Sequence, residues 1–226
     1  MPRQDQQTEL TWQRTDAGET PISTRFDDPY FSLDGGLAET AHVFHAGNGL
    51  PERLRPGFHI AELGFGTGLN LLATALLCTE CQIFFTSFEA YPLTPAQTAR
   101  ALQAFPTLEP LSQPLLNALT HQQTQFTIGQ ITVDLRLGDA GQTVPHWDKR
   151  ADAWFLDGFS PAKNPALWSP DLMRQIALHT APSGTFATYT AAGHVRRSLQ
   201  AAGFTVQRCP GYGRKRHMTS GRLTAE

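Results

Sequence analysis

The sequence is poor in cysteine and lacks any long apolar run. It has 3 Cys among 226 residues, an odd and low number that argues against a disulfide framework and suits a reducing compartment. The longest apolar segment, LNLLATALLC at residues 69–78, is too short to cross a bilayer, and the polar start MPRQDQQTEL is unlike a signal peptide. We therefore expect a cytoplasmic protein without a membrane-spanning segment.

Clusters of metal-ligating residues are also scarce. Cys78 and Cys81 form a single CxxC, and no second pair accompanies them to complete a four-ligand structural zinc site. Apart from His42 and His45, the 8 histidines are scattered along the chain. We expect no metal site, and we interpret the CxxC as a helix-to-strand connection.

The composition allows a substantial core, and the charge is unevenly distributed. The chain is 40% hydrophobic with 14 Phe and 4 Trp, and its length fits one α/β domain. Residues 194–226 contain seven basic side chains and one acid, whereas the preceding residues have a net charge near −8. Such a basic segment suits phosphate binding, although a solvated helix face with a basic turn has the same pattern.

Predicted strands and helices alternate along most of the chain. Apolar runs predict strands and helical spacing predicts the intervening helices, with prolines at two helix starts. The predicted strands are residues 58–63, 82–89, two runs within 125–139, 151–157 and 184–190. The predicted helices are residues 69–77, 95–105, 114–120, 169–180 and 192–203. This alternation indicates a mostly parallel, doubly wound sheet with helices on both faces.

The two ends of the chain depart from this alternation. Residues 1–57 are rich in turn formers, and we expect an N-terminal lead-in packed on a single compact domain formed by residues 58–226. The short runs at 204–209 and 215–223, joined by PGYGR, are typical of a hairpin. One strand near the C-terminus should therefore run antiparallel to the rest of the sheet.

A glycine-rich loop, ELGFGTGLN at residues 62–70, follows the first predicted strand. Ligands of wound sheets bind beyond the carboxyl ends of the strands, and glycines let the backbone approach them closely. The dinucleotide fingerprint is G-x-G-x-x-G. Here Gly64, Gly66 and Gly68 give G-x-G-x-G, so the third glycine comes one position early.

Acidic residues end successive predicted strands. Glu62 precedes the glycines and would repel a pyrophosphate, but it suits a ligand with an ammonium and a sulfonium. Glu89 lies 21 residues after Gly68, where an acid can bind two ribose hydroxyls, and Asp139 is placed to recognise an adenine edge. Together they indicate a Rossmann-like, class I S-adenosylmethionine-dependent methyltransferase.

Asp157 ends the next strand, in LDGFSPAKNPALW, and should face the methyl acceptor. Its carboxylate suits an aliphatic amine. We expect it mainly to orient the amine and, secondarily, to accept or relay its proton. Phe159, Trp168 and Tyr189 are candidates for stacking on a base, and Lys163 for contacting a phosphate. Ordinary core packing explains the three aromatic residues equally well.

At these residues the sequence resembles the methyltransferase domain of the MnmC family, bifunctional enzymes of tRNA wobble-uridine modification, and its stand-alone counterpart MnmD. The resemblance covers almost the whole chain, and LDGFSPAKNP with GYGRKR are its most specific segments. It implies methylation of the exocyclic amine of 5-aminomethyl-2-thiouridine in the tRNA anticodon stem-loop, giving 5-methylaminomethyl-2-thiouridine.

The resemblance also assigns roles to residues. It implies that Asp157 is the catalytic acid and that the basic C-terminal segment contacts tRNA. The expected S-adenosylmethionine-binding residues are Glu62, Gly64, Phe65, Gly66, Thr67, Gly68, Asn70, Glu89, Asp139 and Asp157. The expected substrate or tRNA contacts are Phe159, Lys163, Asn164, Trp168, Tyr189, Arg196, Arg197, Arg214, Lys215 and Arg216.

One feature of the bifunctional family has no counterpart in this sequence. Those enzymes continue into an FAD-dependent oxidase that exposes the amine, and this chain contains no second dinucleotide fingerprint. The sequence is compatible with a stand-alone enzyme or with one domain of a longer protein that has an oxidase domain or partner. An FAD requirement is not expected for this chain.

Three other functions remain open at this point. A small-molecule amine methyltransferase would have the same scaffold, but it has no need of a basic patch. A non-catalytic tRNA-binding module would gain nothing from acids in its pocket. An NAD oxidoreductase is disfavoured by the glycine spacing and by Glu62.

Overall fold

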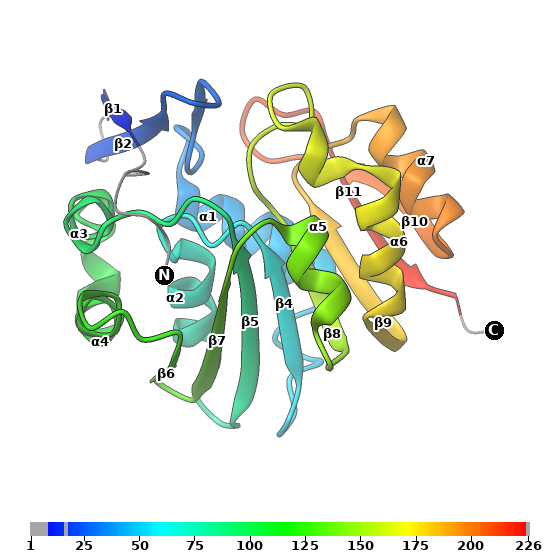
Figure 1. Ribbon diagram of the computed structural model, residues 1–226, viewed down its shortest axis with the longest axis horizontal. Helices are drawn as coiled ribbons and strands as arrows, with labels where there is room; N and C mark the ends of the chain where they lie inside the picture. Colours follow the sequence, from blue (N-terminus) through cyan, green and yellow to red (C-terminus); the bar gives the residue numbers. More distant parts are fainter. Residues whose placement is uncertain (1–8, 16–17, 225–226) are drawn as a thin grey trace.

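The computed structural model describes residues 9–15 and 18–224, and its centre is an eight-stranded sheet (Figure 1). The strands lie in the order β10-β11-β9-β8-β4-β5-β7-β6. Their bounds are β4 His59–Leu63, β5 Ile83–Glu89, β6 Gln125–Ile128, β7 Ile131–Leu137, β8 Ala151–Leu156, β9 Thr180–Thr188, β10 Phe204–Pro210 and β11 His217–Leu223. In chain order, the sheet begins with the central strand β4. β5 and β7 follow on one side of it, and β8 and β9 then follow on the other. The switch point of the winding therefore lies between β4 and β8.

The central strands β9, β8, β4, β5 and β7 are parallel, as the alternating pattern predicted. Helices cover both of their faces, so apolar side chains are needed on both faces. Ile60 and Phe155 belong to the core cluster on one face, and Ala61 and Trp154 belong to the cluster on the other. All four are fully buried, and burying a large apolar side chain stabilises the fold by about 1.5–3 kcal/mol.

The helices start where local sequence signals predict. Thr94 caps α3 and forms a capping box with Gln97, and Pro95 is its first residue. Ser169 accepts a hydrogen bond from the backbone N–H of Leu172 at the start of α6. The helices of the α/β part are α2 Leu69–Leu77, α3 Pro95–Leu102, α4 Glu109–Thr120, α5 Ala140–Thr143, α6 Pro170–Leu178 and α7 Gly193–Ala201.

Antiparallel strands close both edges of the sheet. β10 and β11 form the expected hairpin, and β11 runs antiparallel to β9. The prediction of an antiparallel strand near the C-terminus is therefore confirmed. At the opposite edge, β6 is antiparallel to β7 through a turn at Gly129, whose φ of +57° favours glycine.

The described part of the N-terminal lead-in forms paired strands and short helical segments. β1 Leu10–Thr15, β2 Gly18–Ser23 and β3 Asp28–Pro29 form a small separate sheet. α1 Gly36–Glu39, the π-helix Thr40–His45 and the 3-10 turn Ala46–Asn48 follow, and Val43 and Phe44 pack into the central core. The lead-in thus packs on the sheet, and residues 25–40 reach the carboxyl ends of its strands.

Within residues 9–15 and 18–224, every helix falls short of the length and apolar character needed to cross a bilayer.

Candidate active site

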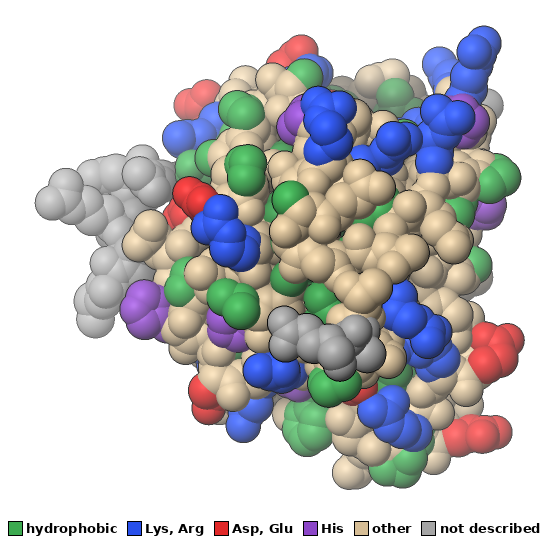
Figure 2. Space-filling view, turned by 90° about the vertical axis from the view of Figure 1, so that its right-hand side faces the viewer, with side chains coloured by type: hydrophobic (Ala, Val, Ile, Leu, Met, Phe, Trp, Pro, Cys, Tyr) green, Lys and Arg blue, Asp and Glu red, His purple; other side chains and the backbone are tan. Residues whose placement is uncertain are grey.

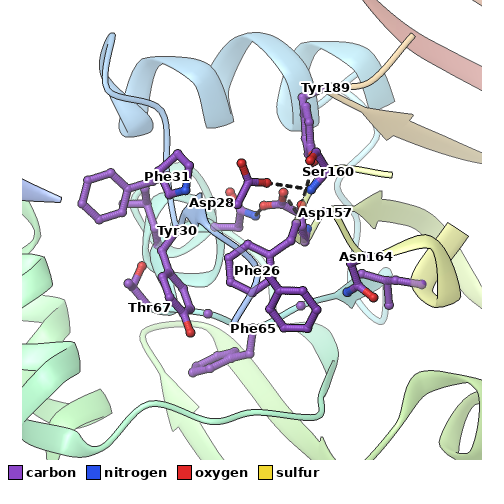
Figure 3. A pocket seen from close by; sticks show the side chains of 18 of the residues that line it. Phe26, Asp28, Tyr30, Phe31, Phe65, Thr67, Asp157, Ser160, Asn164 and Tyr189 are labelled. Atoms are coloured by element: carbon purple, nitrogen blue, oxygen red, sulfur yellow. Dashed lines mark hydrogen bonds between the residues drawn. The ribbon is translucent and has the colours of Figure 1, made fainter. Parts of the chain in front are cut away.

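A cavity of about 600 Å³ lies at the carboxyl ends of the central strands (Figure 3). Small-molecule sites occupy roughly 300–1,000 Å³, so a nucleoside-sized ligand fits it. The loops after β4, β5, β7 and β8 form one part of the lining, and residues 25–40 with the β10–β11 turn form most of the rest, to which Phe44, Leu172 and Tyr189 are added. The cavity therefore lies at the switch point that the winding predicts.

The glycine loop between β4 and α2 is shaped by positive φ angles. Gly64 has φ +78°, and a Cβ there would lie 3.1 Å from the Cα of Gly158. Gly68 has φ +75°, and its Cβ would lie 2.8 Å from a methyl group of Leu115. Gly64 lines the cavity with Phe65, Gly66 and Thr67, whereas Gly68 does not. Gly68 is the N-cap of α2 and lies behind the cavity lining, against Leu115 and Phe65.

Glu89 lines the cavity at the end of β5, as the sequence predicted. Its carboxylate accepts hydrogen bonds from the backbone N–H of Gly66 at 2.9 Å and of Tyr91 at 2.6 Å. Burial raises the pKa of Glu89, and these backbone hydrogen bonds oppose that rise. Glu89 lines the cavity, so its carboxylate is within reach of hydroxyl groups of a ligand bound there.

Asp139 lines the cavity at the N-terminus of α5, after β7. Ala140 and Gly141 line it beside Asp139, so backbone and side chain are both presented there. The acids after β5 and β7 thus face one cavity, as the strand-end pattern indicated.

Glu62 is placed differently from the expectation. It is 1% exposed and does not line the cavity. Asn70 Nδ2 donates to one of its carboxylate oxygens at 2.9 Å, and the Ser87 hydroxyl donates to the other at 2.6 Å. Burial raises the pKa of Glu62 well above its ordinary value. Its carboxylate is held between Asn70 of α2 and Ser87 of β5, behind the cavity lining.

Asn70 connects this buried acid to the cavity. Its Nδ2 also donates to Asp157 Oδ2 at 2.8 Å, and its Oδ1 accepts a hydrogen bond from the Thr40 hydroxyl at 2.6 Å. The amide orientation is therefore fixed by partners on both of its polar atoms. Asn70 lines the cavity beside Asp157.

Asp157 lies at the switch point, directly after β8. Its Oδ1 accepts the backbone N–H of Gly158 at 2.8 Å. Burial raises the pKa of Asp157 to about 7, and the hydrogen bonds from Gly158 and Asn70 act in the opposite direction. A positively charged ligand would stabilise the ionised form of this carboxylate.

The structure adds a wall that sequence reasoning missed. Residues 25–40 contribute Phe26, Asp28 and Tyr30, and Asp28 accepts a hydrogen bond from the backbone N–H of Ser160 at 2.7 Å (Figure 3). Phe26 stacks on Phe159 with ring centroids 4.7 Å apart. The segment FDDPYFS, residues 26–32, belongs to this wall. Its composition and spacing alone did not indicate a binding role.

Tyr30 has an unsatisfied hydroxyl within the site. Its side chain extends toward Phe65 and Thr67 of the glycine loop (Figure 3). Among the described residues, this buried hydroxyl has no hydrogen-bond partner. Burial and the nearby Glu89 raise its pKa, so it is a hydrogen-bond donor at neutral pH. Buried hydroxyls normally have partners, and a ligand in the cavity would supply one.

The expected acceptor-side residues separate into two groups. Phe159, Asn164 and Tyr189 line the cavity, and the Tyr189 hydroxyl donates to the Gly158 carbonyl at 2.8 Å. Trp168 is 1% exposed and donates its indole N–H to the Phe159 carbonyl, so it belongs to the core. Lys163 pairs with Asp27 and Asp28 and lies outside the cavity lining.

The basic C-terminal segment reaches the cavity at two positions. Arg214 and Lys215 line it from the β10–β11 turn. Arg214 pairs with Asp34 at 3.2 Å, and Lys215 pairs with Glu39 at 2.8 Å. The other expected tRNA contacts lie outside the lining, namely Arg196, Arg197 and Arg216. Figure 2 views the side that carries α7 and β10, and Lys and Arg side chains gather along its upper edge.

These features fit S-adenosylmethionine. The cavity has room for it, Glu89 offers acceptors for ribose hydroxyls, and Tyr30 offers a free donor. Gly64 and Gly66 leave the backbone open where side chains would meet Gly158 and Tyr30. The carboxylates around the cavity suit a ligand with positive charge.

Comparison with known families agrees with this fit. A sequence model described as S-adenosyl-L-methionine-dependent methyltransferase matches residues 104–224, just over half of the chain. The chain is 45% identical over 229 residues to the tRNA 5-methylaminomethyl-2-thiouridine biosynthesis bifunctional protein MnmC of Chromobacterium violaceum, covering 94% of this chain and 34% of that protein. It is 46% identical over 231 residues to the protein of the same name from Pseudomonas aeruginosa, covering 96% and 35%. The chain therefore spans about a third of the length of these curated relatives.

Solved structures give the same picture. MNMC2 from Aquifex aeolicus matches with a TM-score of 0.78 and 26% identity, covering 98% of this chain and 73% of that chain. DesVI from Streptomyces venezuelae matches with a TM-score of 0.50 and 12% identity, covering 83% and 92%, which concerns the fold alone.

Proposed function

The chain belongs to the S-adenosyl-L-methionine-dependent methyltransferases, and from this membership we propose that it methylates an exocyclic amine of a tRNA wobble uridine. The resemblance to the MnmC methyltransferase domain is confirmed by relatives of 45% and 46% identity. Their names concern biosynthesis of 5-methylaminomethyl-2-thiouridine in tRNA. The proposed reaction accordingly converts 5-aminomethyl-2-thiouridine into 5-methylaminomethyl-2-thiouridine.

The observation that carries this proposal is the placement of Asp157 in the same cavity as Glu89 and the glycine loop. Glu89 and Asp139 suit the nucleoside part of the cofactor, and Tyr30 suits a further hydrogen bond to it. The residues proposed to hold the cofactor are Tyr30, Gly64, Phe65, Gly66, Thr67, Asn70, Glu89, Asp139 and Asp157.

When bound, S-adenosylmethionine supplies an electrophilic methyl group on a positively charged sulfur. The protein's main task is then to align the acceptor nitrogen with that methyl group and to limit water access. Asp157, held by Asn70 and Gly158, is the group proposed to orient the amine. Phe26 and Phe159 form an apolar wall beside it.

The rim of the cavity supports a nucleic-acid substrate. Arg25 lies 4.4 Å from the ring centroid of Tyr91, and Arg214 is 84% exposed at the β10–β11 turn. Single-stranded RNA loops are recognised through such cations and through aromatic stacking. We propose the anticodon stem-loop as the contacted region and a cytoplasmic reaction. An oxidase domain or partner that exposes the amine would supply the substrate.

The proposal is tested with tRNA from cells that lack this modification. The protein is incubated with labelled S-adenosylmethionine, and the tRNA is digested to nucleosides and separated. We expect label only in 5-methylaminomethyl-2-thiouridine, and loss of labelling with Asp157→Asn. Labelling of a small amine in preference to tRNA would identify a small-molecule methyltransferase, and tRNA binding without any transfer would identify a binding module.

A further inference from the structure

Lys215 lines the cavity from the β10–β11 turn and is held there by two contacts. Its Nζ donates a hydrogen bond to Glu39 Oε1 at 2.8 Å and lies 4.1 Å from the ring centroid of Tyr189. The Glu39 side chain is 11% exposed and the Lys215 side chain 42% exposed, so the carboxylate lies in the wall and the lysine covers it from the solvent side. The ammonium of Lys215 is therefore fixed at the cavity wall.

This wall adjoins Asp157. The Tyr189 hydroxyl donates to the carbonyl of Gly158, the residue after Asp157, and Glu39, Lys215 and Tyr189 line the same cavity. The negative charge of Glu39 raises the pKa of Asp157, and the positive charge of Lys215 lowers it. Both charges therefore act on the space in which the acceptor amine would meet Asp157.

Other titratable groups around the cavity have their own partners. Asp34 pairs with Arg214, Asp28 is bonded to Ser160, and Glu62 lies behind Asn70. The remaining groups that face the cavity are Arg25, Tyr30, Glu89 and Asp139. Among the described residues, Asp157, Glu39, Lys215 and Asp28 are the charged groups that act on Tyr189 at the acceptor end.

We propose that the positive charge of Lys215, fixed against Glu39, keeps the acceptor amine in its neutral, nucleophilic form. This inference rests on the proposed function, because it concerns the amine substrate. A free alkylamine has a pKa near 10 and is mostly protonated at neutral pH. A fixed positive charge nearby disfavours a second one and lowers that pKa, whereas Asp157 and Glu39 alone would raise it.

The proposed effect matters because only the neutral amine can react. Its nitrogen lone pair forms the new N–C bond while the S–CH₃ bond breaks and leaves its electron pair on sulfur. The positive charge passes from sulfur to nitrogen, and the resulting ammonium loses a proton to Asp157 or to water. An amine already protonated has no lone pair for the first step.

The test compares two variants that break the same ion pair with opposite changes of charge. Single-turnover methyl transfer to tRNA is measured against pH for Lys215→Met and Glu39→Gln. We expect the rising limb to move up by about one pH unit in Lys215→Met and down in Glu39→Gln. Lys215→Arg retains the charge and should keep the wild-type midpoint. Lys149→Met, which removes an exposed lysine outside the cavity lining, serves as the matched control and should leave the midpoint unchanged.

A second readout does not depend on activity. Carbon NMR of the ligand-free protein, with the Asp157 carboxyl assigned by its loss in Asp157→Asn, gives the titration midpoint of that group. We expect a midpoint near 7 in the wild type, a higher one in Lys215→Met and a lower one in Glu39→Gln.

The outcomes separate this inference from the proposed function. Midpoints that shift in the same direction in both variants, or in neither, would overturn the role of Lys215 and indicate a structural ion pair. A wild-type protein that transfers no methyl group to tRNA would overturn the proposed function and, with it, the role of Lys215 toward the amine. Opposite shifts in both readouts would support the inference.

Discussion

The side-chain amide of Asn70 donates a hydrogen bond to Asp157 Oδ2 at 2.8 Å, which ties the first turn of α2 to the residue after β8. The same Nδ2 group also bonds Glu62, so one amide holds two carboxylates in fixed positions. The acid that is proposed to meet the amine is thereby oriented by residues of β4 and α2.

Removing this amide should weaken both the fold and the site. In Asn70→Ala, two buried carboxylates and the Thr40 hydroxyl lose a partner, and leaving a buried polar group unsatisfied costs about 1–3 kcal/mol. We expect a comparable loss in the free energy of unfolding, measured by urea denaturation, and slower methyl transfer. An Asn70→Ala protein with wild-type stability would show that Asn70 does not organise these acids.

Cofactor affinity should depend on pH through Asp157. Because burial raises the pKa of Asp157 to about 7 in the ligand-free protein, its ionised fraction grows as the pH passes through that value. A cationic ligand binds the ionised form better, so the affinity for S-adenosylmethionine should rise by up to about tenfold from one unit below to one unit above that pKa. Calorimetric titrations at several pH values measure this rise.

Asp157→Asn provides the control for this pH dependence, because it removes the titrating group and leaves the amino group of the cofactor unchanged. The linked effect on stability has the opposite sign. A carboxyl whose pKa is raised by folding stabilises the ligand-free fold at low pH, and that contribution is lost as the pH rises through about 7. Equal pH dependence of affinity in both proteins would argue against a contact between Asp157 and the cofactor's charge.

Alanine substitutions at two glycines with the same φ angle distinguish the cost of backbone strain from the cost of a steric clash of the added Cβ. Gly64 and Gly57 both have φ +78°, but a Cβ on Gly64 would press against the backbone of Gly158, whereas nothing lies within 4 Å of one on Gly57. We expect Gly57→Ala to cost about 1–2 kcal/mol of unfolding free energy. Gly64→Ala should cost more, and it should also weaken cofactor binding about tenfold or more. Equal losses in both variants would show that Gly64 makes no close approach.

The exposed cations at the rim should govern the salt dependence of tRNA binding. Neutralising Arg214 and Arg216 together should weaken binding and reduce the slope of log K against log salt by up to about 1.5. Lys149→Ala with Arg150→Ala is the matched control, because these exposed residues precede β8 at its amino end, whereas the cavity lies at the carboxyl ends of the strands. If the two double variants behaved alike, the C-terminal basic segment would not be the tRNA contact.

The sequence predicted those features that depend on local chemistry. Apolar runs marked the central strands, Ser169 and Pro170 marked the start of α6, and the acids after β5, β7 and β8 were expected at one edge. Glu62 was misplaced because its position on β4 turns its side chain toward α2 and Asn70. Spacing along the chain indicates that an acid lies near a strand end, but neighbouring side chains decide which way it faces.

Local sequence patterns did not predict the cavity wall formed by residues 25–40. Asp28 meets Ser160 and Glu39 meets Lys215 across more than a hundred residues of sequence. Residues 25–40 have little regular periodicity, since their aromatic and acidic side chains serve contacts with distant loops. Their contribution to the cavity depends on the three-dimensional fold, which places residues 25–40 against the loop after β8 and the β10–β11 turn.

The most direct test of the account is a crystal structure with S-adenosylhomocysteine bound. We predict that its ribose hydroxyls contact Glu89, that the Tyr30 hydroxyl donates to it, and that its sulfur faces Asp157. A ligand bound outside this cavity, or one whose sulfur points away from Asp157, would contradict the proposal that Asp157 orients the methyl acceptor.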